Sequence, residues 1–139
     1  MLKSILIWKH QLPAFAWAIF ILVLCTSSNG GFVPHNFIGV HTDKWGHAFI
    51  FSVQVYFLML GFIKMWRYSF LINKIRLISV LIAAVYAIAI ELIQHYFTTD
   101  RMGDYLDVVA DFVGILCGLI MFHTVYGNLK FLDREEKTQ

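Results

Sequence analysis

Charged residues are scarce in this chain. Only 14% of its 139 residues are Asp, Glu, Lys or Arg, whereas 59% are hydrophobic. Most of the charges lie between long apolar runs instead of alternating with apolar residues inside them. Such a composition is typical of membrane proteins.

Several other features are missing, and each absence excludes a class of protein. No stripe of Lys and Arg alternates with aromatic residues, and the net charge is only +2, so we expect no nucleic-acid partner. The sequence contains no nucleophile elbow, phosphate-binding P-loop or zinc-protease motif, so no reaction type follows from a motif. Its two cysteines, Cys25 and Cys117, are expected at different membrane depths and do not suggest a redox pair. Without repeats or a linker, residues 1–139 are predicted to form a single domain.

Four apolar segments are long enough to cross a bilayer, which takes about 20 residues for a helix. They are Leu12 to Cys25 with Ile5 to Trp8 before it, Trp45 to Met65, Leu77 to Phe97, and Tyr105 to Tyr126. The sequence therefore predicts an all-α integral membrane protein, a bundle of four transmembrane helices. Lys9, His10 and Pro13 interrupt the first segment, which leaves a signal peptide as an alternative. Because no A-x-A-like cleavage site follows, we expect a retained helix.

The basic residues predict the orientation, since Lys and Arg accumulate in cytoplasmic loops. Only Lys44 and Arg101 lie on one predicted side of the membrane. The other nine lie on the opposite side: Lys3, Lys9, Lys64, Arg67, Lys74, Arg76, Lys130, Arg134 and Lys137. We therefore expect both termini in the cytoplasm of a bacterial inner membrane protein, with residues 26–44 and 98–104 facing outward.

Polar residues occur at helical spacing near the outer ends of the second and third segments. Lys44, His47 and Gln54 share one helical face, and Glu91, Gln94 and His95 share another. Lys44 and His47 alone would suit an ordinary helix end, where such residues anchor at the interface. Glu91 is different, because it follows the eleven uninterrupted apolar or aromatic residues 80–90 and lies about 9 Å inside the outer boundary. It must face the bundle interior, pair with a cation or carry a proton.

The fourth segment carries a stripe of carboxylates that continues as a stripe of glycines. Asp104, Asp107 and Asp111 repeat at i, i+3 and i+7, and Gly114 and Gly118 follow on the same face. Asp111 is expected at about the same depth as Glu91. The glycines predict close helix packing, and this face is also where an oligomer could form.

The predicted outer cluster has more acids than bases. Lys44 and Arg101 oppose six carboxylates: Asp43, Glu91, Asp100, Asp104, Asp107 and Asp111. The repulsion among the excess carboxylates must be relieved by protonation of some of them, by separation of the groups, or by a bound cation. These carboxylates, with His47 and His95, could hold a divalent ion, but no ligand spacing is diagnostic. We therefore predict no metal or other cofactor and keep a divalent cation as the minor alternative.

Taken together, these motifs resemble the VanZ-like family over residues 43–118. The matching residues are Asp43, Lys44 and His47; Glu91, Gln94 and Phe97; and Arg101, Asp104, Asp107, Asp111, Gly114 and Gly118. Two departures stand out: Thr99-Asp100 replaces a Pro-Gly that often precedes the arginine, and asparagine is common where Asp111 stands. The resemblance implies a small polytopic bacterial membrane protein associated with resistance to teicoplanin-type glycopeptides. It implies no particular reaction.

Two functions from different classes fit these observations. The first is an envelope enzyme acting on a lipid or a lipid-linked cell-wall precursor, with Glu91 or Asp107 as general base and His47 as acid or proton shuttle. The second is a noncatalytic binding or shielding protein whose polar cluster locks the helices or receives a head group. In the first, the residues predicted to bind substrate are Lys44, Gln94, Arg101, Asp104 and Asp111. A transporter fits less well, because inverted repeats and broken helices are missing.

Overall fold

The computed structural model describes residues 8–27, 42–66, 72–97 and 105–126, and all secondary structure within these ranges is helical. A short 3-10 helix η1 (Lys9–Gln11) leads into α2 (Leu12–Thr26), followed by α3 (Thr42–Trp66), α4 (Ile72–Phe97) and α5 (Tyr105–Tyr126). Four helical spans, the first of which joins η1 to α2, are long and apolar enough to cross a membrane. The predicted four-helix membrane architecture is therefore confirmed, and the orientation of the termini stays a prediction.

Helix boundaries follow local chemistry more than hydropathy. Pro13 lies in the first turn of α2, where a missing backbone N–H does no harm, so it does not break the span as its position suggested. Helix α4 begins at Ile72, five residues before the predicted apolar segment, and includes Lys74 and Arg76. Long basic side chains can lie along an apolar helix end and keep their charges at the interface. Hydropathy thus located the apolar part of this helix but not its start.

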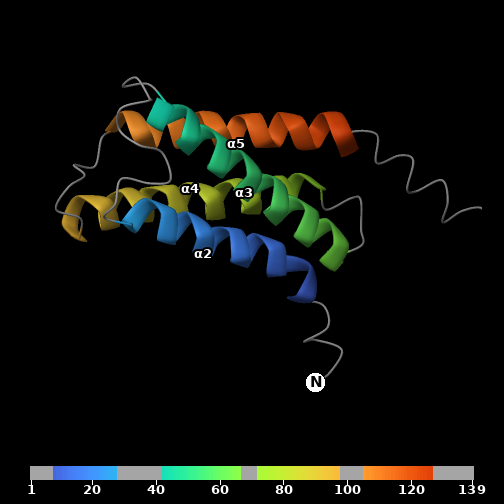
Figure 1. Cartoon of the computed structure of the whole chain (residues 1–139). Helices are drawn as coiled ribbons and strands as arrows, with labels where there is room; N and C mark the ends of the chain where they lie inside the picture. Colours follow the sequence, from blue (N-terminus) through green and yellow to red (C-terminus); the bar gives the residue numbers. More distant parts are fainter. Residues whose placement is uncertain (1–7, 28–41, 67–71, 98–104, 127–139) are drawn as a thin grey trace, which may run out of the picture.

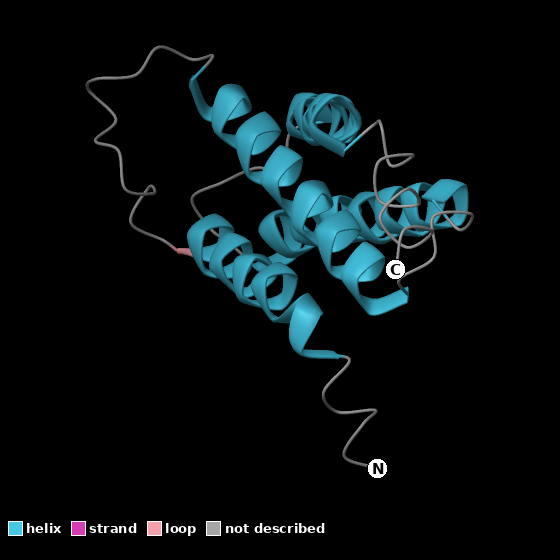
Figure 2. Ribbon diagram, turned by 90° about the vertical axis from the view of Figure 1, so that its right-hand side faces the viewer, coloured by secondary structure: helices cyan, strands magenta, loops and turns pink. Residues whose placement is uncertain are grey.

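Successive helices run in opposite directions. In Figure 1 the last turns of α2 and α4 and the first turns of α3 and α5 all lie toward the left of the bundle. Helix α3 runs obliquely past its neighbours, as the view at right angles also shows (Figure 2). The helix ends that carry the predicted polar residues are therefore gathered at one end of the molecule.

Helix α3 packs most closely against α5, and small residues make this approach feasible. A Cβ atom added at Gly114 would overlap the backbone oxygen of Ala48, and one added at Gly118 would overlap that of Ser52. The glycine stripe therefore packs within the chain, as predicted. Helix α3 covers the Gly114 and Gly118 face within the chain, and association of a second copy through this face stays a prediction.

The core lies between the four helices, and apolar side chains also cover the outward faces. Fully buried members include Ile21 of α2, Phe51 and Met59 of α3, Ile90 of α4 and Ile115 of α5. Large apolar residues point outward from every helix, as lipid contact requires: Phe15 and Ile19, Trp45 and Phe49, Leu77 and Val85, and Val109 and Ile120 are examples. A polar side chain inside such a bundle is therefore separated from both water and lipid.

Helix α2 is joined to the other helices by polar contacts as well as by packing. The indole N–H of Trp17 donates to the carbonyl oxygen of Ile50 at 2.9 Å, and the Tyr86 hydroxyl donates to that of Ala18. In α4, Gln94 donates through Nε2 to the carbonyl oxygen of Cys25 at 3.0 Å. These bonds tie α2 to both α3 and α4, so α2 is an integral part of the bundle.

Candidate functional site

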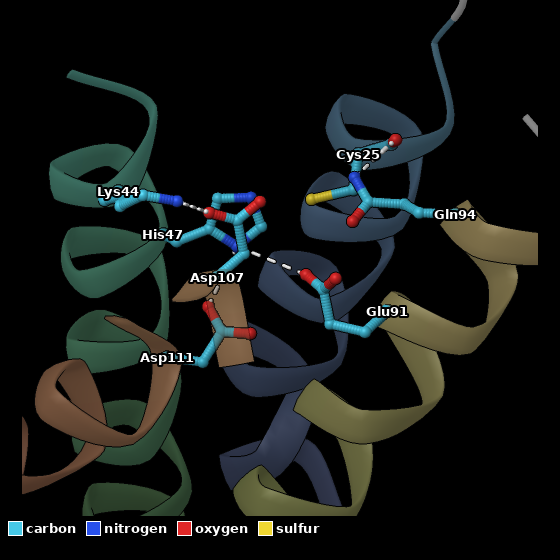
Figure 3. A network of polar contacts seen from close by, with 7 residues as sticks. All are labelled: Cys25, Lys44, His47, Glu91, Gln94, Asp107 and Asp111. Atoms are coloured by element: carbon cyan, nitrogen blue, oxygen red, sulfur yellow. Dashed lines mark hydrogen bonds and ion pairs between the residues drawn. The ribbon is translucent and has the colours of Figure 1, made fainter. Parts of the chain in front are cut away.

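Helices α3, α4 and α5 bring six of the predicted site residues to the same end of the bundle. Figure 3 shows Lys44 and His47 from α3, Glu91 and Gln94 from α4, and Asp107 and Asp111 from α5. Each lies within a few turns of the end of its helix, because Lys44 follows Thr42, Glu91 precedes Phe97 and Asp107 follows Tyr105. A cluster drawn from residues 44–111 can form only because these helix ends meet.

The outer layer of the site is an ion pair. The ammonium group Nζ of Lys44 donates to Oδ1 of Asp107 at 2.9 Å. The Lys44 side chain is 24% exposed and that of Asp107 is 13% exposed, so this pair lies at the rim of the polar cluster. It is the one layer of the described site that a polar head group could contact without entering the core.

The inner layer is buried and has a histidine at its centre. The ring nitrogen Nδ1 of His47 lies at hydrogen-bond distance, 2.9 Å, from Oδ1 of Asp111 and 3.9 Å from Oε1 of Glu91. The first distance is that of a hydrogen bond, whereas the second is too long for one. His47 and Glu91 are nearly buried and Asp111 is completely buried. The prediction that Glu91 and Asp111 lie at the same depth and face the interior agrees with this geometry.

The spacing of residues along the helices explains the two layers. Lys44 and His47 are three residues apart on α3, and Asp107 and Asp111 are four apart on α5, so each pair lies one turn apart on one helical face. Because the close glycine packing brings these faces together, Lys44 meets Asp107 in one layer and His47 meets Asp111 in the next. Helix α4 then supplies Glu91 to the inner layer.

Other predicted residues have different environments. Gln94 is buried but reaches the last turn of α2 through its bond to Cys25. His95 is exposed and contacts the ring of Tyr96 edge-on, so the expectation that it would accompany the carboxylates is wrong. Arg101 and Asp104 lie outside the described residues, as does Asp100. The side chain of Asp43 is not described either.

Two further amide side chains are buried, and only one of them lies on a face that the sequence analysis had identified. Gln54 is buried on the face of α3 that also carries His47, as its spacing predicted. Gln11, at the opposite end of the bundle, is equally buried, and a Cβ atom on Gly61 would lie 2.6 Å from its side-chain oxygen. The sequence analysis did not single out Gln11, and its contact with α3 explains its burial. The cysteines are both free, Cys25 buried and Cys117 exposed.

The fold and the site together define a small multi-pass α-helical membrane protein with a buried polar cluster between its helices. The family model described as VanZ/LLP1 matches residues 7–126. The chain belongs to the VanZ-like family, and the match extends well beyond the motifs at residues 43–118 that indicated it. No curated protein and no solved structure matches the chain.

Proposed function

We propose that this protein resides in the bacterial inner membrane and acts on the polar head group of a lipid or lipid-linked cell-wall precursor from the extracytoplasmic side. Through this action it would contribute to resistance to teicoplanin-type glycopeptides, the context that family membership suggests. The observation that carries the proposal is the two-layered site. A buried His47–Asp111 pair with Glu91 beside it lies directly beneath the partly exposed Lys44–Asp107 pair.

The inner layer has the groups that proton transfer needs. A carboxylate bonded to one ring nitrogen of a histidine fixes the ring and leaves the other nitrogen to take or give a proton. Asp111 has this relation to His47, which supports His47 as the acid or shuttle. Glu91 is the second acid of the same layer and suits the role of general base.

The outer layer has the groups that an anionic head group would meet. Lys44 is a point charge at the rim, and it would exchange part of its contact with Asp107 for a phosphate oxygen. In this proposal Arg101 adds a second cation from the outer loop, while Asp104, Asp107 and Gln94 contact the polar parts of the substrate. Asp107 is held by Lys44, which favours a binding role over the general-base role considered from the sequence.

One observation favours a noncatalytic alternative. Both short polar contacts, Lys44 to Asp107 and His47 to Asp111, join α3 to α5, the two helices that already pack most closely. Such pairs can serve to fix the register of two helices in a membrane. The protein would then bind or shield an envelope component through its surface, and the polar cluster would be a structural lock.

The test is a mass profile of lipids and lipid-linked cell-wall precursors in cells that express matched membrane levels of each variant. The variant His47→Gln removes the proposed proton carrier and keeps a polar side chain. His95→Gln is the matched control, because His95 is exposed and lies outside the cluster. Asp107→Asn tests the outer layer in the same way. Teicoplanin susceptibility is measured on the same cultures.

If the site is catalytic, one lipid species changes with the wild type and with His95→Gln and returns to the vector level with His47→Gln. Identical profiles for wild type and empty vector would overturn the enzymatic proposal. Loss of membrane-inserted protein with His47→Gln and Asp107→Asn alike would favour the structural lock.

A further inference from the structure

Three buried side chains from three different helices converge in the inner layer of the site. His47 of α3, Glu91 of α4 and Asp111 of α5 each offer one nitrogen or oxygen atom, and these three atoms lie within 4.8 Å of one another. In Figure 3 the carboxyl groups of Glu91 and Asp111 face each other across the space beside the His47 ring. Convergence of donors from three helices on one point differs from an acidic cluster on a surface, where charges point to solvent.

The donor distances are close to those of a metal site. Two ligands at 2.0–2.2 Å from a tetrahedral Zn²⁺ ion are separated by about 3.4 Å. His47 Nδ1 lies 2.9 Å from Asp111 Oδ1 and 3.9 Å from Glu91 Oε1, so these separations bracket the required value. The two carboxylate oxygens lie within 4.8 Å of each other, so rotation of the carboxyl groups toward a common point would place all three donors around one ion.

An independent observation concerns the second oxygen of Asp111. Asp111 is 0% exposed, and its Oδ2 atom has no hydrogen-bond partner among the described residues. A buried carboxylate oxygen without a partner costs about 1–3 kcal/mol or more when it is charged. A cation would satisfy this oxygen, because both oxygens of a carboxylate can approach a metal.

The kinds of donor narrow the choice of ion. One imidazole nitrogen with two carboxylates suits borderline divalent transition metals such as Zn²⁺, whereas Ca²⁺ and Mg²⁺ prefer oxygen ligands alone. Three protein ligands leave at least one coordination position for water or another molecule, as catalytic rather than structural zinc sites do. A divalent ion would also offset the negative charge of the two buried carboxylates.

We infer that His47, Glu91 and Asp111 form a binding site for a divalent transition-metal ion of the Zn²⁺ class. This inference goes beyond the proposed function and does not depend on it, because metal binding is measured without any lipid substrate. A loaded site would hold the ion where His47 otherwise shares a proton with Asp111.

The test uses the full chain purified in mild detergent, stripped with a chelator, and titrated with Zn²⁺. Bound zinc is measured by elemental analysis after removal of free ion, and thermal unfolding is followed over the same titration. The variants are Glu91→Gln and Asp111→Asn, which keep side-chain size and remove a charged ligand. His95→Gln is the matched control, since an exposed histidine can bind zinc adventitiously.

We expect about one Zn²⁺ per wild-type chain, unchanged in His95→Gln, and a loss of affinity of at least tenfold in Glu91→Gln and Asp111→Asn. Zinc should raise the unfolding temperature of the wild type in a concentration-dependent way, because a ligand that binds only the folded state stabilises it. This measurement needs no variant and covers the case in which the substitutions prevent folding.

The inference would be overturned if the wild type bound no zinc. It would also be overturned if zinc binding were lost with His95→Gln and retained in Asp111→Asn. Zinc binding by the wild type together with an unchanged lipid profile would leave the metal inference in place while overturning the proposed function.

Discussion

At the scale of single residues, the rim of the site is held by one ion pair of intermediate burial. Exposed pairs contribute about 0–1 kcal/mol, whereas breaking a buried pair costs about 3–5 kcal/mol because a charge is left behind. Lys44 and Asp107, at 24% and 13% side-chain exposure, lie between these limits. Removal of one partner should therefore be costly enough to measure without unfolding the bundle.

We predict that Lys44→Met and Asp107→Asn each lower the free energy of unfolding by roughly 1–2 kcal/mol. The double variant should lose less than the sum of the two, with a coupling energy of about 1 kcal/mol, since the second change relieves the charge that the first exposes. The measurement is unfolding in mixed micelles with increasing SDS. Strictly additive losses would mean that the 2.9 Å contact does not contribute to stability.

The histidines show how far residue spacing could predict the site. His47 and His95 are both three or four residues from another polar residue, and periodicity alone placed both on polar faces. His95 is one position further around its helix than Gln94, a rotation of about 100°, and this is enough to turn it outward. Burial of Glu91 could be deduced from its depth in an apolar segment. For His95, only the packing of α4 against its neighbours decides the direction.

At the scale of helices, the contact between α3 and α5 determines whether the site can form. The Lys44 and His47 face meets the Asp107 and Asp111 face only because glycines allow the two backbones to approach. The backbone oxygen of Ala48 lies where a Cβ atom of residue 114 would have to be. A backbone atom in a helix cannot move aside as a flexible side chain can, so the two helices would have to separate.

We predict that Gly114→Ala destabilises the protein by about 1–3 kcal/mol, the usual cost of overpacking. Gly46→Ala is the matched control, because a Cβ atom there meets nothing within 4 Å. It should leave stability unchanged or raise it by up to about 1 kcal/mol through helix propensity. SDS-induced unfolding compares the two variants. Equal effects of the two substitutions would contradict the close approach of α3 and α5.

The polar contacts of α2 are a smaller contribution to the same assembly. Hydrogen bonds between transmembrane helices average about 0.6 kcal/mol, so the bonds from Trp17, Tyr86 and Gln94 together supply roughly what one overpacked glycine removes. Small residues such as Ala83 and Ala87 of α4, which are fully buried, contribute to the same helix association by allowing close packing. The sequence showed the glycine motif plainly, but it gave no signal for which helix those glycines would face.

At the scale of the whole molecule, the four spans and their order were predictable because a bilayer leaves few alternatives. An apolar segment of membrane length must be helical, and short connections make successive helices antiparallel. The meeting of residues 44, 91, 107 and 111 at one end follows from that alternation. Which pairs form within the cluster depends on helix rotation and crossing, and these are set by side-chain packing that no single segment reveals.

Orientation in the membrane determines which leaflet the site can reach. The helix ends that carry Lys44, Glu91 and Asp107 lie at the same end of the bundle. The orientation of the bundle therefore places the whole cluster on one face of the membrane. The excess of Lys and Arg on the other side, nine residues against two, predicts that these ends face outward. The proposed substrates are then head groups in the outer leaflet.

We predict that a cysteine at position 28 is labelled by a membrane-impermeant maleimide in intact cells, whereas one at position 137 is labelled only after permeabilisation. The variants are Ser28→Cys and Lys137→Cys in a chain whose own Cys25 and Cys117 have been replaced by alanine. The cysteine-free chain and a chain that retains only buried Cys25 serve as controls for background labelling. The opposite labelling pattern would show that the site faces the cytoplasm, and a substrate in the outer leaflet would then no longer be proposed. The metal inference would survive that result, because it depends only on how His47, Glu91 and Asp111 converge.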